Sequence, residues 1–151
     1  MSGFVLGVDL DGVCGDYTPN PVGQPPTDGP AAPATFGNET SVWAVSPTEV
    51  YVTDQDNHRI RRILNGQVST WAGVGFPGLV NGPRATASFN YPHELVGRLG
   101  DLLVVDTLNN VVRRIGPASV TTVAGTGQGG FLNAAPPSAQ FNHPLDLGVD
   151  Q

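Results

Sequence analysis

The sequence predicts an all-β protein built from a four-stranded unit that occurs more than once. The stretch 36–75 recurs about 52 positions further on, and a fixed spacing of this size is typical of repeat architectures. The 151 residues include 20 glycines and 14 prolines, more than a helical protein tolerates. Between these turn formers, the segments are short and rich in β-branched and aromatic residues, which favour strands.

The repeat can be followed position by position. Asp54 and Asn57 recur as Asp106 and Asn109. The other matched pairs are Arg61 with Arg113, Arg62 with Arg114, Ile63 with Ile115, Ala72 with Ala124, Gly73 with Gly125, Phe89 with Phe141 and Pro92 with Pro144. The chain therefore holds two full copies of the unit, at 36–75 and 89–127.

Each copy is predicted to form four short strands. In the first copy these are 42–45, 50–53, 58–63 and 67–72, and in the second they are 95–99, 102–105, 110–115 and 120–124. The dipeptide Asn65-Gly66 is a strong hairpin signal between the last two strands of the first copy. Four strands joined by tight turns, with a glycine-rich loop between copies, describe the blade of a β-propeller. On this interpretation 18–35 is the loop ahead of the first blade, because Asp28-Gly29-Pro30 aligns with Asn81-Gly82-Pro83.

Three stretches of the first copy carry a resemblance to a known family. They are D-x-x-N-H-R-I-R-R-I at 54–63, V-S-T-W-A-G-x-G at 68–75 and A-x-F-x-x-P at 87–92. Together they resemble the NHL repeat, named for Asn-His-Leu, and the first copy shows Asn57-His58. The similarity covers nearly everything from 28 to 150 and implies a β-propeller, six-bladed in most members. It leaves the function open, because the family includes scaffolds, RNA binders and lyases.

The repeated polar positions have structural explanations. Asp54 and Asp106 each end a strand, where a carboxylate can accept backbone N–H bonds in the following turn. Within Arg61-Arg62 and Arg113-Arg114 the two side chains face opposite ways, so one of each pair is expected to reach an acidic turn. The glycine of each repeated Ala-Gly pair is expected at a bend that needs a positive φ.

The number of copies does not close a ring, which typically takes about 4 to 8 blades. Residues 141–150 repeat the start of a blade, and 4–17 supply two short strands ahead of an inter-blade loop. We therefore expect 1–17 and 141–151 to be the halves of one composite blade, joined between copies of the chain. With three blades per chain, two copies would form a six-bladed homodimer with two-fold symmetry. The alternative is that the sequence is a piece of a longer propeller.

The opening stretch has a second, local resemblance. Asp9-x-Asp11-Gly-Val follows an apolar strand at 4–8 and resembles the first motif of haloacid-dehalogenase phosphatases. That resemblance implies Asp9 as the nucleophile and Asp11 as the general acid. The family also needs a doubly wound fold and a later basic residue, whereas no helix-period segment follows here and lysine is absent. We interpret the motif as a tight turn between two strands.

The inner strands of a propeller border its central channel, so the candidate ligand-binding residues are those at the strand starts: Ser41, His93, Glu94 and Asp146. The segment 92–95, Pro-His-x-Leu, is similar to one that supplies a zinc-ligating histidine in propeller amidating lyases. A homodimer would bring together two copies each of His93 and Glu94, whereas a zinc site takes three or four ligands. We expect no catalytic residue and no metal cofactor, with zinc or calcium at His93 and Glu94 as the alternative.

Composition and charge exclude several kinds of partner. The net charge is −6, and the seven arginines do not form the basic stripe that a nucleic-acid binder needs. No apolar run is long enough for a transmembrane helix, and no signal peptide is visible, so the chain as written is expected to be cytoplasmic. The lone Cys14 excludes an internal disulfide.

The sequence therefore predicts a non-catalytic binding or assembly module that associates with itself and presents its channel to a protein or small-molecule ligand. The alternative is a propeller lyase or hydrolase with a metal-assisted site built from His93, Glu94 and Asp146.

Overall fold

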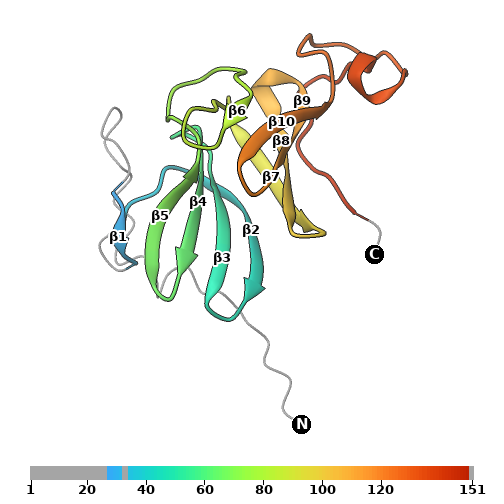
Figure 1. Cartoon of the computed structure of the whole chain (residues 1–151). Coiled ribbons are helices and arrows are strands. Elements are labelled where there is room, and N and C mark those ends of the chain that lie inside the picture. The colour runs from blue at the N-terminus through green and yellow to red at the C-terminus, as the bar shows by residue number, and fades with distance from the viewer. Residues whose placement is uncertain (1–26, 32–33, 150–151) are drawn as a thin grey trace.

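The computed structural model describes residues 27–31 and 34–149, which form two antiparallel β-sheets of five strands each. In both sheets four strands follow one another as a meander, and a two-residue strand lies at one edge. Figure 1 shows the two sheets, with the loop that contains β6 leading from the first to the second. The strands expected at 4–17, with Asp9, Asp11 and Cys14, lie outside the described residues.

The first sheet has the strand order β1-β5-β4-β3-β2, and the second has the order β6-β10-β9-β8-β7. The first consists of β1 (Gly29–Pro30), β2 (Glu39–Ser46), β3 (Glu49–Asp54), β4 (Arg59–Leu64) and β5 (Gln67–Ala72). The second consists of β6 (Gly82–Pro83), β7 (Pro92–Arg98), β8 (Asp101–Asp106), β9 (Val111–Ile115) and β10 (Ser119–Ala124). The predicted all-β class is confirmed, and each predicted strand in the two copies is found, with ends that differ by up to three residues.

Helical structure in the described part of the chain consists of two short 3-10 turns, η1 (Thr107–Asn109) and η2 (Pro136–Ser138). Neither approaches the length and apolar character that a membrane-crossing helix needs.

Tight turns set the register of the hairpins. Asn65 (φ 50°) and Gly66 (φ 73°) connect β4 to β5, as the Asn-Gly signal predicts. Positive φ at both positions matches the twist of the flanking strands. Leu99 (φ 52°) and Gly100 (φ 85°) connect β7 to β8 in the same way.

The two-residue strands show that each sheet takes its edge strand from the loop before it. Gly29-Pro30 pairs with β5, and Gly82-Pro83 pairs with β10. The sequence alignment of these two loops therefore identified a true structural equivalence. It did not identify them as strands, because two residues carry no periodic signal.

The main hydrophobic core lies between the two sheets. The first sheet contributes Tyr51, Ile60 and Ala72, the connecting loop contributes Ala87 and Phe89, and the second sheet contributes Leu95, Leu102, Val104, Ile115 and Val120. Trp43 and Trp71 pack against this core from the first sheet. A smaller cluster lies on the other face of the first sheet and contains Ala34, Phe36, Val50, Val52 and Val68.

The outward face of the second sheet is less covered than the equivalent face of the first. Strand register places Leu103 and Val112 where the first sheet has Tyr51 and Ile60. Tyr51 and Ile60 are 7% and 0% exposed, whereas Leu103 and Val112 are only half-buried. The difference arises because a second sheet packs on one face, and no further sheet packs on the other within the described residues.

The loops that follow β5 and β10 contain the same hydrogen bonds. In 73–91, the N–H groups of Gly73, Val74 and Gly78 donate to the carbonyls of Arg84, Ala87 and Phe89. In 125–143, the N–H groups of Gly125, Thr126 and Gly130 donate to the carbonyls of Pro136, Ala139 and Phe141. Gly73 and Gly125 have φ values of 104° and 97°, as expected for the repeated Ala-Gly pairs. The repeat therefore continues through the second loop.

One arginine of each pair is buried and holds the loop that precedes its sheet. Arg113 is 0% exposed, and its Nη1 donates to Asp106 Oδ2 at 2.8 Å and to the Ser88 carbonyl at 3.0 Å. Its Nη2 donates to the Val80 carbonyl and to Asn81 Oδ1, both at 2.9 Å. A single guanidinium thus joins β9, the end of β8 and two points of the loop.

Arg61 repeats this arrangement in the first sheet. Its partners are Asp54 Oδ2, the Thr35 and Thr27 carbonyls, and Asp28 Oδ1. The second arginine of each pair faces the opposite way, so that Arg62 pairs with Glu49 and Arg114 pairs with Asp101. The prediction that one arginine of each pair reaches an acidic turn is confirmed.

Asp54 and Asp106 accept hydrogen bonds from more than the arginine. The donors are the Gly37 N–H and Asn57 amide for Asp54, and the Asn90 N–H and Asn109 amide for Asp106. The backbone donors lie before the inner strand, and not in the turn after the aspartate, where they were expected. Burial raises the pKa of both carboxyls, and the amide, backbone and arginine hydrogen bonds oppose that rise.

Replacing Arg113 with methionine should therefore destabilise the protein strongly, because it leaves the Asp106 carboxylate buried without its cation. We expect a loss of about 3–5 kcal/mol in the free energy of unfolding, measured by urea titration. The matched control is Arg114→Met, since Arg114 is 53% exposed and its pair with Asp101 should contribute about 0–1 kcal/mol. Equal losses in the two variants would contradict this account of the buried pair.

His58 and Asn110 occupy equivalent turn positions with left-handed backbones, at φ 53° and 55°. His58 Nδ1 accepts the backbone N–H of Tyr91 at 3.2 Å, and Asn110 Oδ1 accepts that of His143 at 2.8 Å. The first contact requires a neutral imidazole, because a protonated ring has no free acceptor. Burial lowers the pKa of His58 from its usual value of 6.5.

Acidification should therefore destabilise the protein through His58. The unfolded chain takes up the proton first, so stability present at neutral pH is lost as the pH falls below 6.5. His58→Asn supplies the acceptor used in the second sheet and should fold normally, since asparagine tolerates a positive φ. Urea titrations at pH 7.5 and pH about 5.5 should show a smaller loss for the variant than for the wild type. An identical loss of unfolding free energy in the two proteins would show that protonation of His58 does not cause the pH dependence.

Candidate functional site

The inner strands β2 and β7 meet where the sequence predicts a ligand site. Ser41 is buried, and its hydroxyl donates to Glu94 Oε1 at 2.9 Å and accepts the Leu95 N–H at 3.2 Å. One residue earlier, the Thr40 hydroxyl donates to the His93 carbonyl at 2.6 Å. The structure therefore brings Ser41, His93 and Glu94 together, in a hydrogen-bonded seam between the two sheets.

His93 makes the next contact of the same kind. Its Nδ1 lies 2.8 Å from the carbonyl oxygen of Leu145. Thr40, His93 and Leu145 are equivalent repeat positions, so each contacts the backbone of the next. The segment 141–149 thus lies against the second sheet as β7 lies against the first, which Figure 1 shows near the C-terminus.

The C-terminal segment nevertheless forms no strand. Phe141 makes a single bridge to Gly129, and 142–149 has no strand pairing, so the strand expected at 141–150 is absent from 141–149. An isolated inner strand has no neighbour to complete its ladder, which explains the difference. Asp146 lies on this segment beside Leu145, is exposed, and has no hydrogen bond or ion pair to the rest of the described chain.

The seam does not fit a metal site. No group of three or more His, Cys, Asp or Glu side chains lies close enough together in the described residues to hold an ion. His93 and Glu94 supply two candidate ligands, and Glu94 already accepts the Ser41 hydroxyl. Three or four protein ligands are the usual zinc complement. The donors present here fall short of it.

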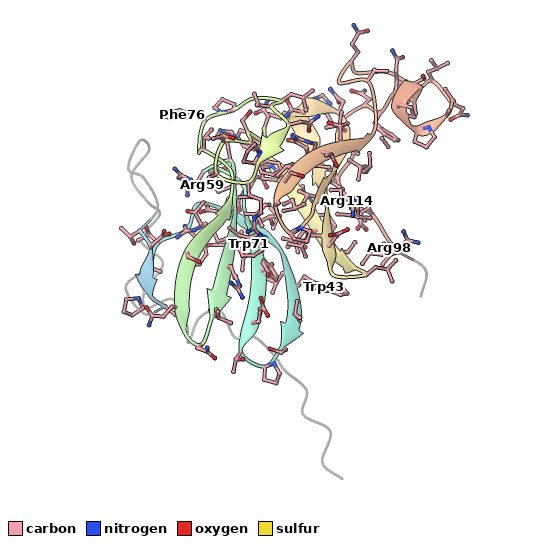
Figure 2. The ribbon with its side chains drawn as sticks, in the orientation of Figure 1. Trp43, Arg59, Trp71, Phe76, Arg98 and Arg114 are labelled. Carbon is pink, nitrogen blue, oxygen red and sulfur yellow. The ribbon has the colours of Figure 1, made fainter. Side chains whose placement is uncertain are left out.

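A groove of about 470 Å³ between the sheets is a second candidate site, which the residue pattern did not predict. Its first wall contains Trp43, Tyr51 and Trp71, and Gly97 and Leu102 belong to the facing wall. The indole Nε1 of Trp43 lies so close to Gly97 that a Cβ there would overlap it. Figure 2 labels both tryptophans, which come from separate strands of the first sheet. Their meeting at a cavity depends on sheet packing, so residue spacing could not reveal it.

Charged side chains border the aromatic wall. Glu49 Oε1 accepts the Tyr51 hydroxyl at 2.8 Å and pairs with Arg62 at 2.7 Å. The hydrogen bond from Tyr51, followed by that from Arg62, lowers the pKa of Glu49, and burial raises the pKa of Tyr51. The Arg84 guanidinium lies 3.6 Å from the centroid of the Trp71 ring, and that of Arg62 lies 4.8 Å from it. Trp71 is therefore held by cations, whereas Trp43 is not.

This chain is similar to several solved protein structures. No family model and no curated protein matches this chain. A Bacteroides thetaiotaomicron VPI-5482 protein of unknown function matches with a TM-score of 0.60 and 26% identity over 65% of this chain. An auxiliary nutrient binding protein from Bacteroides ovatus ATCC 8483 matches with a TM-score of 0.59 and 25% identity over 68% of this chain.

A further auxiliary nutrient binding protein, from Bacteroides thetaiotaomicron VPI-5482, has the same fold, with a TM-score of 0.59 and 23% identity over 70% of this chain. The matched region makes up 26% of the first of the three structures and 30% of each of the other two. This chain therefore matches less than a third of each solved structure.

The seam between β2 and β7 should be sensitive to loss of the Ser41 hydroxyl. Ser41→Ala removes the partner of the Leu95 N–H and of Glu94, and an unpaired buried donor costs about 1–3 kcal/mol. Urea titration of this variant should show that loss, whereas Ser119→Ala, at an exposed strand end, should unfold like the wild type. A Ser41 variant as stable as the Ser119 variant would show that the seam does not hold the sheets together.

Proposed function

We propose that this chain is a non-catalytic binding module of the NHL-like β-propeller type. The two sheets with equivalent loops provide two blades, and the similarity to an auxiliary nutrient binding protein at 25% identity is the observation that supports binding. The module acts without a metal cofactor and takes a small-molecule or protein ligand. Ser41, His93, Glu94 and Asp146 border its channel.

Two features support a further blade beside the second sheet. The segment 141–149 already occupies the place of an inner strand, held by Thr107 Oγ1 on the Pro144 carbonyl and by His93 on the Leu145 carbonyl. The half-buried outward face of the second sheet is the surface on which such a blade would pack.

The second loop also repeats the acceptors that hold an arginine. The Val80 carbonyl, Asn81 Oδ1 and the Ser88 carbonyl bind Arg113. Their equivalents 52 positions later are the carbonyls of 132 and 140 and the side chain of 133, and no arginine contacts them within the described residues. These acceptors are available to a donor from a further blade, and because the strands expected at 4–17 contain no arginine, a second copy would have to supply a donor other than a guanidinium.

Self-association is the route that we propose for supplying that blade. The segment 141–149 of one copy pairs with a strand of a second copy, and two copies close a six-bladed ring. Two-fold closure is the commonest symmetry of soluble oligomers, and it would remove the open strand edges.

Light scattering coupled to size exclusion tests this proposal. We expect twice the chain mass of 15.7 kDa for the wild type, and a monomer after deletion of 141–151. The control, Leu99→Asn, changes a 92% exposed turn residue with a positive φ and should remain dimeric. A wild-type monomer at every concentration would exclude self-association. The further blade would then have to come from another polypeptide segment.

A further inference from the structure

The groove between the sheets has features of a ligand site and lies apart from the seam at the inner-strand starts. It is formed by the hairpin ends of both sheets, with an aromatic wall on the first sheet and, on the second, small or aliphatic residues together with Arg98 and Asp101. Its volume of about 470 Å³ falls within the range of roughly 300–1,000 Å³ that is usual for small-molecule sites.

The aromatic residues of this wall are not required by the repeat. Strand register places Val96 and Leu103 of the second sheet at the positions of Trp43 and Tyr51. Val123 occupies the position of Trp71, since both lie at the bulge between paired residues of the last two strands. The same sheet is therefore built with aliphatic side chains at all three positions. The aromatic set of the first sheet is therefore not required to build the sheet itself; its rings pack against the core between the sheets and line the groove.

The second sheet places small residues opposite these rings. Gly97 packs against the indole edge of Trp43, where a Cβ would overlap Nε1, and the β7–β8 hairpin ends in Leu99 and Gly100. Arg98 is exposed at the end of β7, and its side chain points away from Trp43 in Figure 2. Arg98 and Asp101 also line this wall, and together with Glu49 they bring charges of both signs to the groove, so its lining does not favour a ligand of one charge.

Hydrogen-bonding groups remain available beside the rings. Both bonds to Glu49, from Tyr51 and Arg62, go to Oε1, so Oε2 has no partner among the described residues. Trp43 Nε1 also donates no hydrogen bond within the described part of the chain. The groove thus offers an apolar ring face, one free carboxylate oxygen as acceptor and one N–H donor.

We propose that this groove binds a neutral saccharide. The C–H face of a pyranose ring packs on Trp43, one of its hydroxyl groups donates to Glu49 Oε2, and a hydroxyl oxygen accepts from Trp43 Nε1. This site deepens the proposed binding function and rests on it. Both walls belong to one chain, so the site is complete without closure of the ring.

Isothermal titration calorimetry of the full chain tests the site. The probes are neutral α- and β-linked gluco-, manno- and xylo-oligosaccharides of two to six sugar units, each titrated to millimolar concentration. We expect saturable binding of at least one probe, and Trp43→Val should weaken it by about tenfold or more, equivalent to roughly 1.4 kcal/mol. Valine is the residue that the second sheet uses at this position, so the variant should fold.

Glu49→Gln is a second variant that leaves the aromatic wall intact. It replaces the free acceptor by an amide donor and should also weaken binding, even if Trp43→Val fails to fold. The control is Val96→Ala, on the outward face of the second sheet, which should bind as the wild type does. Binding unchanged in both test variants, or no heat with any probe, would overturn the proposal.

The outcome is separable from that of the proposed assembly. A dimer that binds no sugar would support the proposed ring and contradict the saccharide site. A monomer that binds sugar, and loses this binding in the Trp43 variant, would support the saccharide site and contradict the proposed ring.

Discussion

The buried pair of an arginine and an aspartate is the interaction on which the rest of this structure depends. Arg61 and Arg113 are both 0% exposed, and each satisfies a buried carboxylate and three acceptors in the loop ahead of its sheet. Without the guanidinium, the buried carboxylate would lose its cation and the loop would lose three of its hydrogen bonds, which is costly. The pair thus fixes where each loop lies, and the loop in turn supplies the edge strand of the sheet.

The sequence allowed much of this arrangement to be predicted. The spacing of Asp54, Asn57 and Arg61 and its recurrence defined the unit, the strands and the opposite facing of the arginine pairs. The carbonyl partners of the arginines could not be predicted, because a backbone oxygen leaves no trace in the residue pattern. Neither could β1 and β6, which consist of Gly29-Pro30 and Gly82-Pro83 and are too short for any periodicity.

The candidate site was predicted less well than the fold. Ser41 and Glu94 do meet, because equivalent positions of adjacent inner strands lie side by side, but their contact serves the seam between the sheets. Asp146 was expected on a strand and lies on an unpaired segment. The aromatic groove was missed because Trp43, Tyr51 and Trp71 come from three strands, and only the packing of the second sheet turns them into a wall.

The loop 73–91 has a consequence for how the molecule loses its structure. Near its start, directly after the last strand of the first sheet, the Val74 carbonyl accepts a hydrogen bond from the Arg59 guanidinium. Further along, the carbonyls of Val80 and Ser88 accept hydrogen bonds from Arg113 of the second sheet. Unfolding of either sheet therefore breaks the hydrogen bonds that hold one part of this loop, and the loop in turn contacts the other sheet. The two sheets should melt as one cooperative unit, with similar protection of their amides from hydrogen exchange.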